Sequence, residues 1–73
     1  MDLTTLAKGQ RGIINNIDAA PDLTVQLLEQ GLTPGSPIRM ISSGIFRDPI
    51  AFAVRGTTIA LRKNEAACIK LRA

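Results

Sequence analysis

Residues 50–62 read IAFAVRGTTIALR, and this stretch predicts two short strands joined by a tight turn. Ile50, Phe52 and Val54 alternate with alanines, which is the pattern of a strand with one buried face. Gly56 begins the turn, because glycine accepts the backbone conformations that tight turns require, and a second strand over 57–62 follows. The stretch therefore favours a β protein over a helical bundle.

Outward from this hairpin, glycines and prolines divide the chain into pieces whose length suits short strands. We expect further strands over 10–18, 37–43 and 68–72, with a hairpin loop over 43–49. The isoleucines within 10–18 do not share one parity, so this strand should contain a bend or a bulge. Small barrels need such bends in order to close.

One main helix is expected over 21–31. Pro21-Asp22 suits its first turn, and Gly31 suits the left-handed position just after its end, with Leu32 folding back onto the helix. A tight turn at Pro34-Gly35 follows. The apolar side of the helix comprises Leu23, Val25, Leu27 and Leu28, and Leu27, Leu28 and Leu32 are expected in the core.

A single helical turn is expected over 64–67, with Asn64 as its N-cap, and Cys68 is expected as a small buried hydrophobic residue. Five short strands and one main helix predict a mainly β fold, a small closed or half-closed β-barrel of the SH3-like type. One domain over residues 1–73 is expected, since the chain is this short. An open sheet with one helix on its face is the alternative.

The composition lacks the side chains that most reactive sites need. The chain has no histidine, and its one cysteine and six Asp and Glu residues form no cluster in the sequence. We therefore expect no enzyme activity, no cofactor and no metal site. The N-terminus lacks the features of a signal peptide, and no run of about 20 apolar residues occurs. A cytosolic location without direct membrane insertion is expected.

The net charge of +3 is spread along the chain, so a dedicated nucleic-acid-binding arm is not expected. Phe46 and Phe52 are the two aromatic residues, and Phe52 is expected to point into the core. At most Phe46 therefore remains on the surface for stacking against nucleic-acid bases. A solvated rim is the favoured interpretation of the basic residues, and a nucleic-acid-binding face is the alternative. The residues that could share this outward face are Arg39, Arg55, Arg62, Lys70 and Arg72.

Several segments, read in this order over nearly the whole chain, resemble the ferrous iron transport protein A family, FeoA. The segments are Gly9-Gln10-Arg11-Gly12, Leu27-Leu28, Gly31-Leu32-Thr33-Pro34-Gly35, Asp48-Pro49-Ile50, Arg55-Gly56 and Ile59-Ala60-Leu61-Arg62. The resemblance implies an SH3-like barrel in the bacterial cytosol, recruited to the inner face of the membrane. Its implied role is accessory to FeoB, a membrane ferrous-iron permease that carries a GTPase domain. The motif residues expected to have structural roles are Gly31, Leu32, Pro34, Gly35, Asp48, Pro49 and Gly56.

The sequence departs from the family pattern around the third strand. Arg47 stands where the family usually carries a glycine before Asp-Pro, and Ala51 and Ala53 stand where it tends to carry charged residues. The surface around this strand should therefore be less polar than in relatives.

The loop over 43–49 contains the strongest candidates for partner binding. Ile45 and Phe46 are adjacent apolar residues, and exposed aromatic residues make good interface centres. The alternative is that one of them covers the core beneath the hairpin. Arg47, Arg55 and Arg62 are the further candidates, and the partner is FeoB or another copy of this chain. A small nucleic-acid-binding barrel and a detached SH3-like domain of a metal-dependent transcriptional regulator are the other hypotheses.

Overall fold

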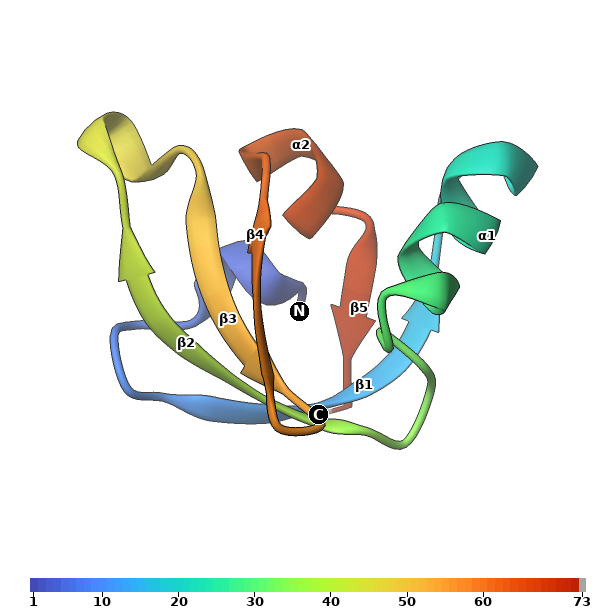
Figure 1. Cartoon of the computed structure of the whole chain (residues 1–73), viewed down its shortest axis with the longest axis horizontal. Helices are drawn as coiled ribbons and strands as arrows, with labels where there is room; N and C mark the ends of the chain where they lie inside the picture. The colour runs from blue at the N-terminus through green and yellow to red at the C-terminus, as the bar shows by residue number, and fades with distance from the viewer. Residues whose placement is uncertain (73) are drawn as a thin grey trace.

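The computed structural model describes residues 1–72 and consists of five strands with four short helical segments (Figure 1). In chain order these are the 3-10 helix η1 (Leu3–Thr5), β1 (Arg11–Ile17), α1 (Pro21–Glu29), β2 (Pro37–Ser43), the 3-10 helix η2 (Ile45–Arg47), β3 (Ile50–Val54), β4 (Thr57–Leu61), α2 (Lys63–Ala66) and β5 (Ile69–Leu71). Every expected strand is present within one or two residues of its predicted ends.

The strands form one antiparallel sheet in the order β4-β3-β2-β1-β5. The register of β1 shifts between Ile14 and Asn16, which confirms the predicted bulge, and a second shift lies in β2 between Met40 and Ser42. Bulges increase the local twist and bend of a strand. The sheet accordingly curls around the core, and α2 connects β4 to β5 at one end (Figure 1).

The core lies inside this curl and follows the predicted alternation. Ile50, Phe52 and Val54 are buried while the alanines between them are half-buried, and Ile69 and Leu71 of β5 also point inwards. Leu3 and Leu6, which the sequence analysis did not place, are buried as well, so η1 belongs to the core. The remaining buried apolar residues are Ile14, Leu27, Leu32, Ile38, Met40, Leu61 and Ala66.

Helix α1 ends as predicted. Gly31 has a φ of 95°, its N–H donates to Leu28 O at 3.0 Å, and the Leu32 N–H donates to Leu27 O at 3.2 Å. These two bonds form a Schellman motif. Leu27 and Leu32 are buried, but the prediction that Leu28 is a core residue is wrong, because 36% of its surface is exposed. It lies about 100° around the helix from Leu27 and so turns away from the sheet.

Helix α2 begins one residue before the predicted N-cap. Arg62, not Asn64, is the N-cap, and its N–H donates to Glu65 Oε1 at 2.8 Å. The Lys63 N–H, which is the first of the helix, donates to Asp48 Oδ1 at 3.1 Å. The prediction that Cys68 is buried is also wrong, since it is half-buried with its Sγ 3.4 Å from Asn64 O.

Candidate partner-binding surface

The loop between β2 and β3 is closed by its own backbone. The Gly44 N–H donates to Pro49 O at 2.9 Å, and the Arg47 N–H donates to Gly44 O at 3.0 Å. A Cβ at Gly44 would lie 2.9 Å from the carbonyl oxygen of Asp48, so this close approach requires glycine. The loop therefore has one defined path, in which η2 projects beyond the sheet at the end of β2 (Figure 1).

Two side chains fasten this loop to the rest of the molecule. Arg47 Nη2 donates to Thr4 O at 3.1 Å and to Leu6 O at 3.0 Å, and both acceptors lie in the N-terminal segment. On the other side, Asp48 accepts the bond from α2 described above. Arg47 was predicted as a contact residue for a partner, and the structure gives its guanidinium group an internal role as well.

Ile45 and Phe46 project from the fastened loop into solvent. Their exposed fractions are 81% and 90%, so the alternative in which one of them covers the core is wrong. Phe46 and Arg47 both have a φ of 59°, in the left-handed region that residues other than glycine seldom adopt. Such backbone conformations concentrate at binding and functional sites. The loop thus presents two apolar side chains at a fixed place.

The other two candidate arginines lie at opposite ends of β3. Arg62 follows Leu61, which pairs with Ile50, so Arg62 lies at the end of the sheet that carries η2. Arg55 lies in the turn at the far end, where its Nη1 donates to Ser36 Oγ at 3.2 Å. The structure therefore places Arg62 with Ile45, Phe46 and Arg47, but not Arg55.

Three of the predicted motif residues, Gly35, Gly56 and Pro49, lie in turns or loops that connect the elements. Gly35 has a φ of 88° and stands third in a turn whose Ser36 N–H donates to Thr33 O at 3.1 Å, with Pro34 before it. The turn between β3 and β4 consists of Arg55 and Gly56, with φ of 51° and 77°, one residue earlier than predicted. Pro49 follows a cis peptide bond at the end of the η2 loop.

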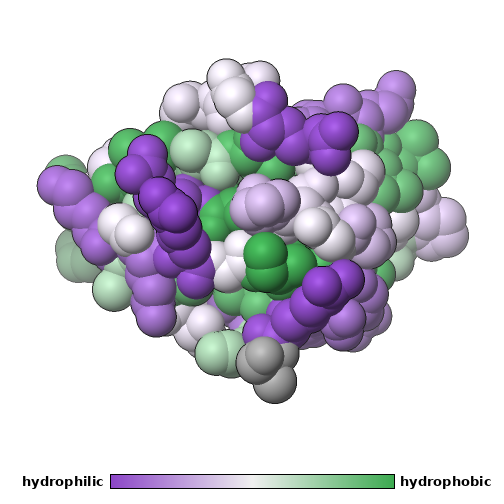
Figure 2. Space-filling view, turned by 90° about the horizontal axis from the view of Figure 1, so that it is seen from below, coloured by the Kyte–Doolittle hydropathy of each residue, from purple (hydrophilic) through white to green (hydrophobic). Residues whose placement is uncertain are grey.

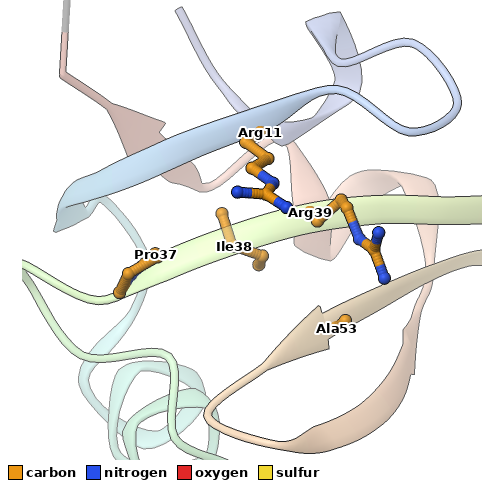
Figure 3. Close-up of a pocket in the computed structure, with 5 residues that line it drawn as sticks. All are labelled: Arg11, Pro37, Ile38, Arg39 and Ala53. Atoms are coloured by element: carbon orange, nitrogen blue, oxygen red, sulfur yellow. The ribbon is translucent and has the colours of Figure 1, made fainter.

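Two surface features were not predicted as sites. Arg11 and Arg39 line a shallow depression of about 260 Å³ on the outside of the sheet, together with Pro37, Ile38 and Ala53 (Figure 3). Arg39 had been placed in a general basic face, but Arg11 had not, and the strand register alone brings the two together. Apolar side chains are also exposed on α1, at Val25 and Leu28.

Within residues 1–72, no three His, Cys, Asp or Glu side chains lie close enough to hold a metal ion together. In the same part of the chain, no helix is both long enough and apolar enough to span a membrane.

The pKa of the Asp2 carboxyl lies below its usual value. Its carboxylate accepts hydrogen bonds from the hydroxyl and the backbone N–H of Thr4, and these bonds hold the pKa of Asp2 below its usual value. Lys70 adds a smaller effect in the same direction, and partial burial opposes it.

Comparison with known proteins gives consistent matches. A family model described as FeoA domain matches residues 1–73. The chain is 30% identical to iron(II) transport protein A of Clostridium thermocellum, with a TM-score of 0.91 over 97% of this chain and 44% of that one, so it spans less than half of that relative. It is also 30% identical to a protein described as iron uptake regulatory protein (FeoA), with a TM-score of 0.88 over 99% of this chain and 95% of that one.

A third solved structure describes the fold directly. FeoA of Stenotrophomonas maltophilia, complexed with zinc and described as a procaryotic SH3 domain protein, is 26% identical, with a TM-score of 0.87 over 99% of this chain and 89% of that one. The predicted SH3-like barrel is therefore confirmed. No curated protein matches the sequence.

Proposed function

The chain belongs to the FeoA domain family, and we propose that it acts as a non-enzymatic accessory protein in bacterial ferrous iron transport by binding a FeoB-like GTPase-permease. Two solved relatives at 30% identity are described as an iron(II) transport protein and an iron uptake regulatory protein. We propose that the protein lies in the cytosol at the inner face of the membrane, where it can contact the GTPase domain of such a permease.

The observation that carries this proposal is the exposed tip of the η2 loop. Ile45 and Phe46 are the two most exposed large hydrophobic residues within 1–72. Burying two such side chains at the centre of an interface supplies the kind of contact that dominates binding energies. Because Arg47 and Asp48 already fix the loop to η1 and α2, little conformational entropy is lost when a partner binds.

Charge at the same end of the sheet favours an acidic partner surface around this apolar centre. Arg62 is exposed beside α2, and Arg47 is exposed at the loop although two carbonyl groups accept its hydrogen bonds. A polar, charged rim around an apolar centre is the usual organisation of a protein interface. Arg55, which lies at the other end of β3, is not part of this surface, and a second copy of the chain is the alternative occupant.

A binding measurement with the intact permease in lipid nanodiscs tests the proposal. We expect the wild-type protein to bind, and the double variant Ile45→Ala/Phe46→Ala to bind at least about tenfold more weakly, since a central pair of this kind contributes about 1.4 kcal/mol or more. The matched control is Val25→Ala/Leu28→Ala, which removes exposed apolar surface from α1 and should leave the affinity within about twofold. The GTP hydrolysis rate of the permease is recorded with each protein.

Two results would contradict the proposal. If the two double variants bind the permease equally well, the η2 tip is not part of the interface. If Ile45→Ala/Phe46→Ala unfolds the protein, the tip belongs to the core. Retention of the wild-type protein on RNA at moderate salt, without binding to the permease, would favour the nucleic-acid-binding alternative.

A further inference from the structure

Arg11 and Arg39 lie opposite each other on the neighbouring strands β1 and β2, on the outside of the sheet. They are direct partners in the strand register, and the Met40 N–H donates to Gln10 O at 3.0 Å in the neighbouring pair. Hydrogen-bonded and non-hydrogen-bonded pairs alternate along an antiparallel ladder, so Arg11 and Arg39 form a non-hydrogen-bonded pair, in which side chains are closest. Figure 3 shows Arg11 reaching from β1 towards β2, and Arg39 reaching from β2 towards β3.

This pair of positive charges has no internal counter-charge among residues 1–72. The strands contain three charged residues, Arg11, Arg39 and Lys70, and all are basic. Arg47 and Arg55 donate side-chain hydrogen bonds within the described chain, whereas Arg11 and Arg39 donate none there. Like charges directly opposite each other in a sheet are destabilising. The two guanidinium groups therefore have their donors free for an anion from outside.

The surface between the two arginines is hollowed and partly apolar. The depression of about 260 Å³ is lined by Pro37, Ile38 and Ala53 in addition to the arginines. Ala53 pairs with Arg39 in the register, and its small side chain leaves space beside the guanidinium group. Figure 2 views the molecule from this side of the sheet and shows strongly hydrophilic side chains beside pale and apolar surface.

We propose that this depression binds a carboxylate side chain from an acidic segment of a partner protein. Each guanidinium group supplies two parallel N–H donors whose spacing matches the two oxygens of a carboxylate, and the second group adds positive charge nearby. The methylene groups of a glutamate would cover the apolar surface of Pro37 and Ala53, which an inorganic anion would leave uncovered. Nucleic acid is disfavoured, because Phe52 is fully buried and Phe46 lies beyond the opposite end of β2. The proposal goes beyond the role in iron transport, since it concerns a second surface.

An NMR titration of the whole protein with a capped hexaglutamate peptide tests this assignment. At about 20 mM salt, where surface charges are weakly screened, we expect saturable shifts at Arg11, Arg39 and Ala53. Arg39→Gln should weaken binding about three- to fivefold, which is the upper part of the range for loss of one exposed charge pair. Lys8→Gln removes the same charge from an exposed turn and should change the affinity less than about twofold. Capped hexaglutamine should cause no shift.

Several results would overturn the assignment. Equal weakening by Lys8→Gln and Arg39→Gln would show that net charge alone attracts the peptide. Tighter binding of a single-stranded DNA hexamer at the same residues would assign the site to nucleic acid, and full displacement by an equal concentration of inorganic phosphate would assign it to a free anion. Arg39→Gln should melt no lower than wild type, because it relieves repulsion between like charges, and a clearly lower melting temperature would show a structural role instead.

Discussion

Asp2 organises the start of the chain through one carboxylate. Its backbone forms an isolated β-bridge with Lys70 of β5. Its carboxylate caps η1 by accepting hydrogen bonds from the backbone N–H and the hydroxyl of Thr4. The charged form of Asp2 is the one that accepts these bonds, which is why its pKa is lowered. A single residue thus connects the N-terminal segment to the last strand.

The pH dependence of stability follows from this lowered pKa. Asp2 contributes stability above its unfolded value of about 3.9, and the contribution is lost as the pH falls through the lower folded value. Asp2→Asn should therefore be less stable than wild type by under about 1 kcal/mol at neutral pH, and the difference should shrink in acid. Urea unfolding at a series of pH values measures it.

A second variant distinguishes the cause. Thr4→Val removes the hydroxyl donor and should raise the pKa of Asp2 in a carbon-detected NMR titration. An unchanged pKa of Asp2 in this variant would contradict the assigned hydrogen bond.

Helix α2 depends on a residue that lies 15 positions earlier in the chain. Asp48 accepts the bond from the Lys63 N–H, and beside it the first turn of this four-residue helix has the bond from the Arg62 N–H to Glu65 Oε1. Asp48→Ala should cost about 1 kcal/mol, the usual effect of losing a capping side chain, and should speed hydrogen exchange at the Lys63 amide.

The matched control for this element is Glu29→Ala, which removes the same charge from an exposed position at the end of α1. It should leave the Lys63 amide unchanged. If both variants exchange at the wild-type rate, Asp48 does not cap the helix.

Whether an element could be predicted depends on how far apart in the sequence its contacting residues lie. The end of α1 could be predicted, because the Schellman motif depends on neighbouring residues alone. The start of α2 at Lys63 could not, because Asp48 reaches the Lys63 N–H only once the sheet has formed. For the same reason, the bonds of Arg47 to Thr4 and Leu6 could not be predicted, nor could the exposure of Ile45 and Phe46.

At the scale of the whole molecule, the alternation in the sequence was enough to predict a curled five-stranded sheet, but not the strand order. The pairing of β1 with both β2 and β5 depends on long-range register. That register also makes neighbours of Arg11 and Arg39, so this candidate site could not be recognised from spacing along the chain.

The N-terminal segment contributes to the free energy of unfolding of the whole domain. Leu3 is fully buried in η1, and Leu→Ala substitutions in cores cost about 2–5 kcal/mol. A domain of this size has about 3–5 kcal/mol in total, so Leu3→Ala should be largely unfolded at room temperature. Circular dichroism with urea titration measures this.

The control is Val25→Ala, since Val25 is 55% exposed and its removal should change stability by under about 0.5 kcal/mol. Comparable stability of the two variants would contradict the placement of η1 in the core.

The pairing of the first residues with β5 has a consequence for folding during synthesis. The Leu71 N–H donates to Met1 O at 2.8 Å, and Ile17 pairs with Ile69. During synthesis, β5 with its buried side chains can therefore join the sheet only after nearly all of residues 1–72 have left the ribosome. Contacts between distant parts of a chain are also slow to form. Leu3 and Leu6 therefore reach their full burial only after β5 has joined the sheet.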